Sequence, residues 1–262
     1  MNDEQLLQVA LEAAQRGAKV AADGFHHVRE ITSKGGAELV TEFDLAAESA
    51  IKDVLRRQTP DIAVVAEESG GQRGGDLVWY VDPIDGTTNY AHGHPFWAVS
   101  VGLVTRGQPT VGVVVAPALG STWQARLGAP CLRDDRPCHV STIGSLRDAL
   151  LTTGFAYDRR TATDNNVREF ETLLRQAIGM RRCGSAALDL CLTASGVYDG
   201  YWEKKLRAWD MAAGVVLVRA AGGRVSSWRG ASVDVGSGEV LASNGRIHDE
   251  LIDHLARARQ QP

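Results

Sequence analysis

The sequence has few cysteines and no long apolar run. Its 262 residues include four cysteines, too few and too loosely spaced for a disulfide scaffold, and without the C-x-x-C pairs of zinc sites. No stretch approaches the roughly 20 apolar residues that span a bilayer. The first residues, MNDEQLLQVALEAAQ, carry acids in place of the basic region of a signal peptide. These absences favour a cytoplasmic protein with no membrane partner.

An excess of positive charge is also missing. The formal net charge is −4 and the isoelectric point is about 6.0, so nothing indicates nucleic acid as a partner. An acidic protein that binds an anionic substrate needs cations or backbone N–H groups at its site. With 44% hydrophobic residues, the chain can bury a core as one large domain or as two lobes that share an interface.

The apolar patterns predict helices and strands in separate clusters. We expect helices over 3–21, 44–59, 165–178, 186–195, 210–221 and 247–257, and strands over 62–66, 77–81, 197–202 and 240–242, with an antiparallel meander across 96–128. Such segregation favours layered α+β packing over strict βαβ alternation. We expect one catalytic unit, 1–262, made of an N-terminal lobe, 1–143, and a C-terminal lobe, 144–262.

Acidic residues stand at the ends of several apolar segments. They are Asp44, Glu67, Glu68, Asp82, Asp85 and Asp210. Carboxylate oxygens suit Mg²⁺ or Mn²⁺ better than a soft metal. Because like charges repel at short range, a cluster of such residues would itself predict bound cations.

The stretch VDPIDGTTN, residues 81–89, is the most informative of these segments. Pro83 fixes its own φ and restricts Asp82, so the chain turns sharply and the carboxylates of Asp82 and Asp85 can converge. Gly86 allows a close approach of backbone to ligand. Residues 87–89 can open a helical turn whose free N–H groups point at an anion. This stretch could therefore supply both metal ligands and a phosphate cradle.

Ordinary capping and turn roles are the alternative explanation for the same acids. Asp82 would be a turn residue, Asp85, Asp210 and Asp44 would cap helices, and Glu67 with Glu68 would be a solvated strand end. Taken singly, each alternative is the commoner arrangement. The joint pattern is harder to explain in this way.

The ordered set of motifs resembles the inositol monophosphatase family. VDPIDGTTN (81–89) is similar to the family's first signature and WDMAAG (209–214) to its second. LVTEFD (39–44), AEES (66–69), RRCGSAALDLC (181–191) and YWEK (201–204) stand in the expected order, and the match runs to about Gly223. Residues 129–135 depart from the pattern, because Asp134-Asp135 stands where an Asn-Gly turn is common. We expect that difference to affect the lobe junction or a dimer contact.

The resemblance implies a fold, a cofactor and a reaction. The fold is the layered α-β-α-β-α sandwich shared with fructose-1,6-bisphosphatase. The cofactor is Mg²⁺, as two or three ions that Mn²⁺ can replace, and the protein is expected to be a lithium-sensitive homodimer. The reaction is hydrolysis of a small phosphorylated polyol, with myo-inositol monophosphate favoured, by direct attack of a metal-activated water.

The resemblance also assigns roles to single residues. The first metal is held by Glu67, Asp82 and the carbonyl of Ile84, and the second by Asp82, Asp85 and Asp210. Glu67 and Asp44 lie near any third ion. Thr87, aided by Asp44, and Glu67 orient or deprotonate the water, and the N–H groups of Gly86 and Thr87 hold phosphate. The substrate pocket is formed by Gly184, Ser185, Ala186, Glu203 and Asp210, with Lys34 and Glu68 as further candidates.

Other functions stay open at this level. Proteins with the same scaffold hydrolyse histidinol phosphate, sugar bisphosphates or adenosine bisphosphates. The stretch 87–90 resembles the inositol type, since Thr88 stands where the histidinol and nucleotide types tend to have lysine. A different alternative is a protein that docks onto a transcription or RNA-processing assembly.

Overall fold

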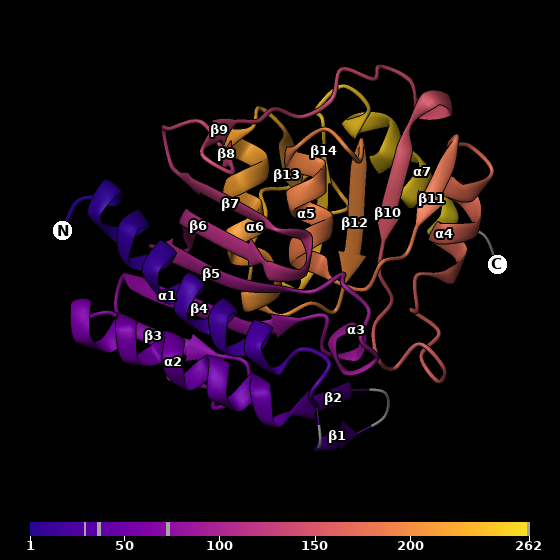
Figure 1. Ribbon diagram of the computed structural model, residues 1–262. Coiled ribbons are helices and arrows are strands. Elements are labelled where there is room, and N and C mark those ends of the chain that lie inside the picture. The colour runs from indigo at the N-terminus through magenta and orange to yellow at the C-terminus, as the bar shows by residue number, and fades with distance from the viewer. Residues whose placement is uncertain (29, 36–37, 72–73, 261–262) are drawn as a thin grey trace.

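Five layers build the molecule (Figure 1). The computed structural model describes residues 1–28, 30–35, 38–71 and 74–260, apart from the side chains of Lys34 and Gln260. The role expected for Lys34 therefore falls outside the described side chains. A helix pair, a seven-stranded sheet, a second helix pair, a five-stranded sheet and a third helix pair follow one another. This confirms the predicted α-β-α-β-α sandwich.

The first layer consists of α1 (Asp3–Gly24) and α2 (Glu42–Gln58). Asn2 caps α1 as predicted, in a capping box with Gln5. Thr41, rather than Asp44, caps α2. Between the helices lies a hairpin that the sequence patterns did not predict, β1 (Ile31–Gly35) with β2 (Glu38–Thr41). The apolar side of α1 and α2 packs on the first sheet.

The seven-stranded sheet contains the predicted meander. Its order is β3 (Ala63–Ala66), β4 (Leu77–Asp85), β5 (Ala98–Thr105), β6 (Gln108–Ala116), β7 (Ser121–Arg126), β8 (Leu132–Arg133) and β9 (Arg136–Pro137). Only the pair β3–β4 is parallel. A one-turn 3-10 helix, Pro117–Leu119, precedes β7. Because β3 and β4 are parallel, the acids just after β3 and those at the end of β4 lie at the same edge of the sheet.

Residues 129–135 do not disturb the sheet. They lead into the β8–β9 hairpin, where Asp134 and Asp135 have φ values of +52° and +60°. Asp tolerates the left-handed region better than most residues, so an Asp-Asp pair can form the turn that Asn-Gly commonly makes. The carboxylate of Asp134 also accepts hydrogen bonds from Thr122 N at 2.8 Å and Ser121 Oγ at 3.1 Å.

The central helices are α5 (Ala186–Ala194) and α6 (Ala208–Ala220), which lie between the sheets in one continuous apolar core. The five-stranded sheet has the order β11 (Gly179–Arg181), β10 (Leu150–Thr153), β12 (Gly200–Lys204), β14 (Glu239–Ser243) and β13 (Arg224–Ser226). A 3-10 turn, Leu146–Asp148, precedes β10. No pattern had predicted β10, β11 or β13.

The last layer consists of α4 (Val167–Leu174) and α7 (His248–Gln260), which cover the outer face of the second sheet. A short helix, α3 (Thr87–Ala91), stands at the end of the first sheet, where the sequence predicted a helical turn. Among the described residues, no helix combines the length and apolar character needed to cross a membrane. The division into lobes at residue 143 stays a prediction, since the core is shared by both sheets.

Candidate active site

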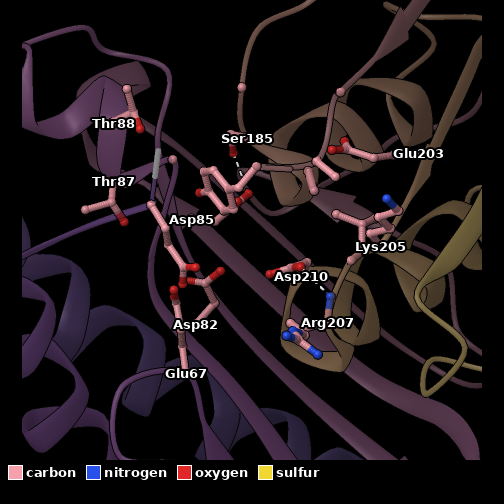
Figure 2. Close-up of a pocket in the computed structure, with 18 of the residues that line it drawn as sticks. Glu67, Asp82, Asp85, Thr87, Thr88, Ser185, Glu203, Lys205, Arg207 and Asp210 are labelled. Carbon is pink, nitrogen blue, oxygen red and sulfur yellow. Dashed lines mark hydrogen bonds between the residues drawn. The ribbon is translucent and has the colours of Figure 1, made fainter. Parts of the chain in front are cut away.

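One pocket of about 950 Å³ gathers nearly all the predicted site residues (Figure 2). Its lining comes from the ends of β3 and β4, the start of α3, the loops that follow β10 and β12, the segment that leads into α5, and the start of α6. Of the predicted residues with described side chains, the lining includes Glu67, Glu68, Asp82, Ile84, Asp85, Gly86, Thr87, Gly184, Ser185, Ala186, Glu203 and Asp210. Asp44 lies behind Thr87.

Asp82 and Asp85 converge as the sequence predicted. Asp82 does form the turn of the alternative explanation, because its Oδ1 accepts a hydrogen bond from Ile84 N at 3.1 Å. In Figure 2 the carboxylates of Glu67 and Asp82 nevertheless point toward each other, and Asp85 lines the same pocket. The hydrogen bond from Ile84 N therefore orients the Asp82 carboxylate, which still faces the pocket.

Asp85 does not cap α3, contrary to the alternative explanation. Gly86 is the N-cap residue, in a left-handed conformation and with no side-chain cap. The Oδ2 of Asp85 instead accepts hydrogen bonds from Ser185 Oγ and from Ala187 N, both at 2.6 Å. Asp85 thus faces the positive end of α5, a helix about 100 residues later in the chain. Ser185, predicted as a substrate contact, holds this carboxylate and caps α5.

Asp210 and Asp44 occupy equivalent positions at the starts of their helices. Each is the third helical residue, and its Oδ2 accepts the N-cap amide, from Arg207 N at 2.6 Å and from Thr41 N at 2.7 Å. Figure 2 shows Asp210 facing the pocket. Capping and pocket-facing roles are therefore compatible, because one carboxylate has two oxygens.

The hydroxyl of Thr87 connects α3 to α2. Thr87 Oγ1 lies 3.1 Å from Asp44 Oδ1 and 3.0 Å from the carbonyl oxygen of Ile84, and both carboxylate and hydroxyl are buried. The second oxygen of Asp44 is held by Thr41, through its amide and its hydroxyl. This chain of bonds fixes the orientation of the Thr87 hydroxyl.

The turn that carries Glu67 and Glu68 is braced from α2. The buried carboxylate of Glu48 accepts hydrogen bonds from Glu68 N at 2.7 Å and Ser69 N at 3.1 Å. Lys52, one turn along α2, forms an ion pair with Glu48 at 3.5 Å. Glu67 and Glu68 are therefore not a loose strand end.

Gly86 lets the loops at the pocket floor approach each other. Gly86 has a φ of +95°, and a Cβ there would lie 3.0 Å from the carbonyl oxygen of Phe96 and 3.2 Å from that of Gly184. The side-chain amide of Asn89 joins the same loops, since its Nδ2 donates to Phe96 O at 2.7 Å and Cys183 O at 2.8 Å. Asn89 thereby holds the substrate-side loop against α3.

Comparison with known proteins agrees with this geometry. The sequence profile of the inositol monophosphatase family matches residues 2–261. This chain belongs to the inositol monophosphatase family. The family's inositol-1-monophosphatase from Synechocystis sp. is 45% identical, over 97% of this chain and 90% of that protein. The Nus factor SuhB of Pasteurella multocida is 35% identical, over 95% of each. The solved inositol monophosphatase from Anabaena superposes with a TM-score of 0.91 at 39% identity, covering 98% of this chain and 97% of that one.

The acids of this inositol monophosphatase family member repel one another. Burial, followed by the charges of Glu67, Asp85 and Asp210, raises the pKa of Asp82 well above its usual value. Burial raises the pKa of Asp85 to about 6, although its bonds from Ser185 and Ala187 act in the opposite direction. Burial and the charge of Asp85 also raise the pKa of Asp210 well above normal. An uncompensated cluster of this kind is what hard cations relieve.

The donor set therefore fits Mg²⁺. Every predicted ligand is a carboxylate or carbonyl oxygen, and the described lining contains no histidine or cysteine. Within the described ranges, no three His, Cys, Asp or Glu side chains are yet drawn together in the arrangement of a formed metal site. A cation between the carboxylates would reverse the sign of the local field.

Sequence reasoning missed the cationic rim of the pocket and the loop above it. Arg182, Lys205 and Arg207 line the pocket, as does the loop 154–159 with Tyr157. Tyr157 is half-exposed, and partial burial with the charges of Glu67, Asp210 and Asp85 raises its pKa. Arg182 lies within the recognised motif RRCGSAALDLC and Lys205 directly follows YWEK, and their charge was the available signal.

Proposed function

We propose that this phosphatase hydrolyses the monophosphate of a small polyol, with myo-inositol monophosphate as the favoured substrate and Mg²⁺ as the cofactor. One observation carries the proposal: acids from β3, β4 and α6 line one pocket at the start of α3. When bound there, the ions would neutralise phosphate charge and lower the pKa of the attacking water. Glu67, Asp82, Asp85, Asp210 and the carbonyl of Ile84 would hold them as two or three ions, which Mn²⁺ could replace.

The protein groups have separate tasks in this proposal. The Thr87 hydroxyl, whose Oγ1 lies 3.1 Å from Asp44 Oδ1, would position the water. The proton of the water would pass to the Glu67 carboxylate, or to Thr87 Oγ1 as the Thr87 hydroxyl gives its own proton to Asp44. The N–H groups of Gly86 and Thr87 would donate to phosphate oxygens. Glu203 would accept a hydrogen bond from a substrate hydroxyl, beside Gly184 and Ala186. Charge neutralisation and positioning would thus provide most of the rate enhancement.

The acid cluster can be tested with one conservative substitution. Phosphate release from myo-inositol 1-phosphate would be followed over a Mg²⁺ titration for wild type and for Asp85→Asn. We expect Asp85→Asn to lose at least 100-fold in kcat/KM at millimolar Mg²⁺. The control is Asp76→Asn, because Asp76 lies on the surface in an ion pair with Arg106 at 3.1 Å. Near-normal activity of Asp85→Asn would contradict the assignment.

A panel of phosphate esters tests which substrate the protein prefers. Wild-type kcat/KM would be compared for myo-inositol 1-phosphate, fructose 1,6-bisphosphate, histidinol phosphate and adenosine 3′,5′-bisphosphate. Thr88 at the pocket and Glu203 opposite favour the polyol phosphate. A preference for the adenosine bisphosphate would overturn this choice. Lithium inhibition and a homodimer are further expectations of the proposal, measured in the same assay and by light scattering.

A second role is favoured by the relatives named Nus factor SuhB, such as that of Pasteurella multocida. We propose docking onto a transcription or RNA-processing assembly as an additional role here. In a strain that lacks this gene, Asp82→Ala protein should restore growth if docking is the essential role. Failure of this variant, with rescue by wild type, would assign the essential role to catalysis.

A further inference from the structure

The carboxylate of Glu203 lies between Gly154 and Tyr201. The residue is near the end of β12, and its carboxylate faces the pocket (Figure 2). Gly154, just after β10, lies directly against it, since a Cβ at residue 154 would come within 2.0–2.2 Å of the carboxylate atoms. No side chain at residue 154 is compatible with Glu203 where it stands.

Tyr201 holds the same carboxylate from the other side. Residues 201 and 203 share one face of β12, because side chains alternate along a strand. The hydroxyl of Tyr201 donates to Glu203 Oε2 at 2.8 Å, and Tyr201 has no exposed surface. β10 flanks Tyr201 on one side at Thr152 and β14 on the other at Ala242, so its ring is fixed in the middle of the sheet.

We propose that Tyr201 is a positioning residue for substrate recognition, which orients Glu203 to accept one substrate hydroxyl through Oε1. This inference depends on the proposed function, in which Glu203 contacts the polyol. Tyr201 acts through Glu203 and need not touch the substrate. The absence of a side chain at Gly154 leaves room for the Glu203 carboxylate, and the hydrogen bond from Tyr201 fixes its orientation.

The chemistry of a buried carboxylate supports this role. Burial, with a smaller effect from the charge of Asp85, raises the pKa of Glu203 to about 7, while the hydrogen bond from Tyr201 and the charge of Arg182 act in the opposite direction. Without the phenol, Oε2 would lose its donor, and a buried carboxylate with an unsatisfied oxygen rotates or takes up a proton. Either change would leave a poorer acceptor for the substrate hydroxyl. The acids that catalyse the reaction would be unaffected, so binding should change more than turnover.

The first test separates KM from kcat with two substrates. Tyr201→Phe should raise KM for myo-inositol 1-phosphate by about 5- to 20-fold, with kcat changed less than 3-fold, and should leave KM for p-nitrophenyl phosphate unchanged. p-Nitrophenyl phosphate has no polyol hydroxyl for Glu203. The control Tyr90→Phe removes another buried phenol, whose hydroxyl bonds the carbonyl of Ala21 at 2.6 Å, and should not change the ratio of the two KM values. An unchanged KM in Tyr201→Phe, or an equal rise for both substrates, would overturn the proposal.

A double-mutant cycle shows whether Tyr201 acts through Glu203. In a Glu203→Ala background, which removes the acceptor of the Tyr201 hydroxyl, Tyr201→Phe should change KM by less than about 2-fold. The same multiplicative rise in both backgrounds would show a merely structural effect and overturn the inference. Wild-type inactivity toward the whole substrate panel would instead overturn the proposed function, so the two failures are distinguishable.

Gly154 provides a second variant should Tyr201→Phe fold poorly. Gly154→Ala should raise KM for myo-inositol 1-phosphate as Tyr201→Phe does, since the new methyl group displaces the Glu203 carboxylate. In a Glu203→Ala background the collision is removed, and Gly154→Ala should then have no further effect on KM. A rise that persists in that background would contradict the account of the Glu203 site.

Discussion

Gly102 of β5 lies directly opposite Gly112 of β6, and both lie under Ala213 of α6. A Cβ at residue 102 would come within 2.6 Å of Ala213 N, and one at residue 112 within 2.4 Å of Ala213 O. The glycine pair therefore lets the backbone of α6 rest on the first sheet. Because Asp210 stands in the first turn of α6, this contact sets the distance between Asp210 and the acids of β4.

Gly112→Ala tests this contact. The methyl group has no space beneath the helix backbone, so we expect a loss of about 2–3 kcal/mol in the free energy of unfolding and a fall in phosphatase activity as Asp210 moves. Urea denaturation and the Mg²⁺-dependent assay measure the two effects. Gly144→Ala is the control, since nothing lies within 4 Å of a Cβ at residue 144. Equal stability of the two variants would show that α6 is not held by the glycine pair.

Magnesium should stabilise the fold apart from any effect on turnover. Repulsion among Asp82, Asp85 and Asp210 would be relieved by bound cations, and at 100 times Kd a single ion adds about 2.7 kcal/mol. We expect the Tm of wild type to rise with Mg²⁺ and to fall back with a chelator. Asp82→Asn should start from a higher Tm without metal, because one repelling charge is gone, and should respond little to Mg²⁺. If Asp82→Asn and the surface variant Asp76→Asn respond alike, the cations bind elsewhere.

Thr87→Val removes only the hydroxyl that Asp44 orients. A proton-transfer group typically contributes about 10²- to 10⁴-fold, so we expect kcat to fall by at least 100-fold while the Mg²⁺-dependent rise in Tm remains. Thr87→Ser keeps the hydroxyl and should retain most of the activity. Steady-state kinetics at saturating Mg²⁺ measures both variants. A Thr87→Val enzyme with kcat within 3-fold of wild type would remove Thr87 from the mechanism.

A buried histidine far from the pocket makes stability depend on pH. His248 has no exposed surface, and its ring nitrogens each lie 2.8 Å from a hydroxyl, Nε2 from Ser226 and Nδ1 from Ser243. Burial and, to a lesser extent, the charge of Arg224 lower the pKa of His248 from 6.5 to about 4. In the unfolded chain His248 therefore becomes protonated below about pH 6.5, whereas in the folded protein it stays neutral down to about pH 4.

The resulting stability is present above pH 6.5 and is lost as the pH falls toward 4, by about 3 kcal/mol at most. Urea denaturation of wild type and His248→Gln between pH 7.5 and 4.5 should show curves that converge toward acid. His27→Gln, at an exposed position, should follow the wild-type curve. Parallel curves for wild type and His248→Gln would show that His248 is not kept neutral by the fold.

Local sequence information predicted the parts of the site that adjoin in the chain. Asp82 and Asp85 are joined by one turn around Pro83, and the helical turn after Gly86 involves only residues 87–89. The arrangement of both therefore followed from local backbone rules. The strand end that presents Glu67 and the helix start that presents Asp210 followed from apolar runs. The layered fold could be predicted because most of its apolar helices and strands are long enough to show a hydrophobic period.

Contacts between distant segments could not be predicted in the same way. The bonds of Ser185 to Asp85, Asn89 to Cys183 and Tyr201 to Glu203 depend on how two sheets are placed. The hairpin β1–β2 and the strands β10 and β11 are short and mixed in polarity, so no period is visible in them. Gly154 carries no local sign that a carboxylate lies against it.

The central claim is that acids from separate strands and helices form one site for paired cations beside a phosphate cradle. Crystals soaked with Mn²⁺ and phosphate, measured at the manganese absorption edge, test it most directly. The account predicts anomalous peaks bounded by Glu67, Asp82, Asp85 and Asp210, with phosphate against Gly86 and Thr87. Manganese bound only outside this pocket, or no peak at saturating Mn²⁺, would contradict it.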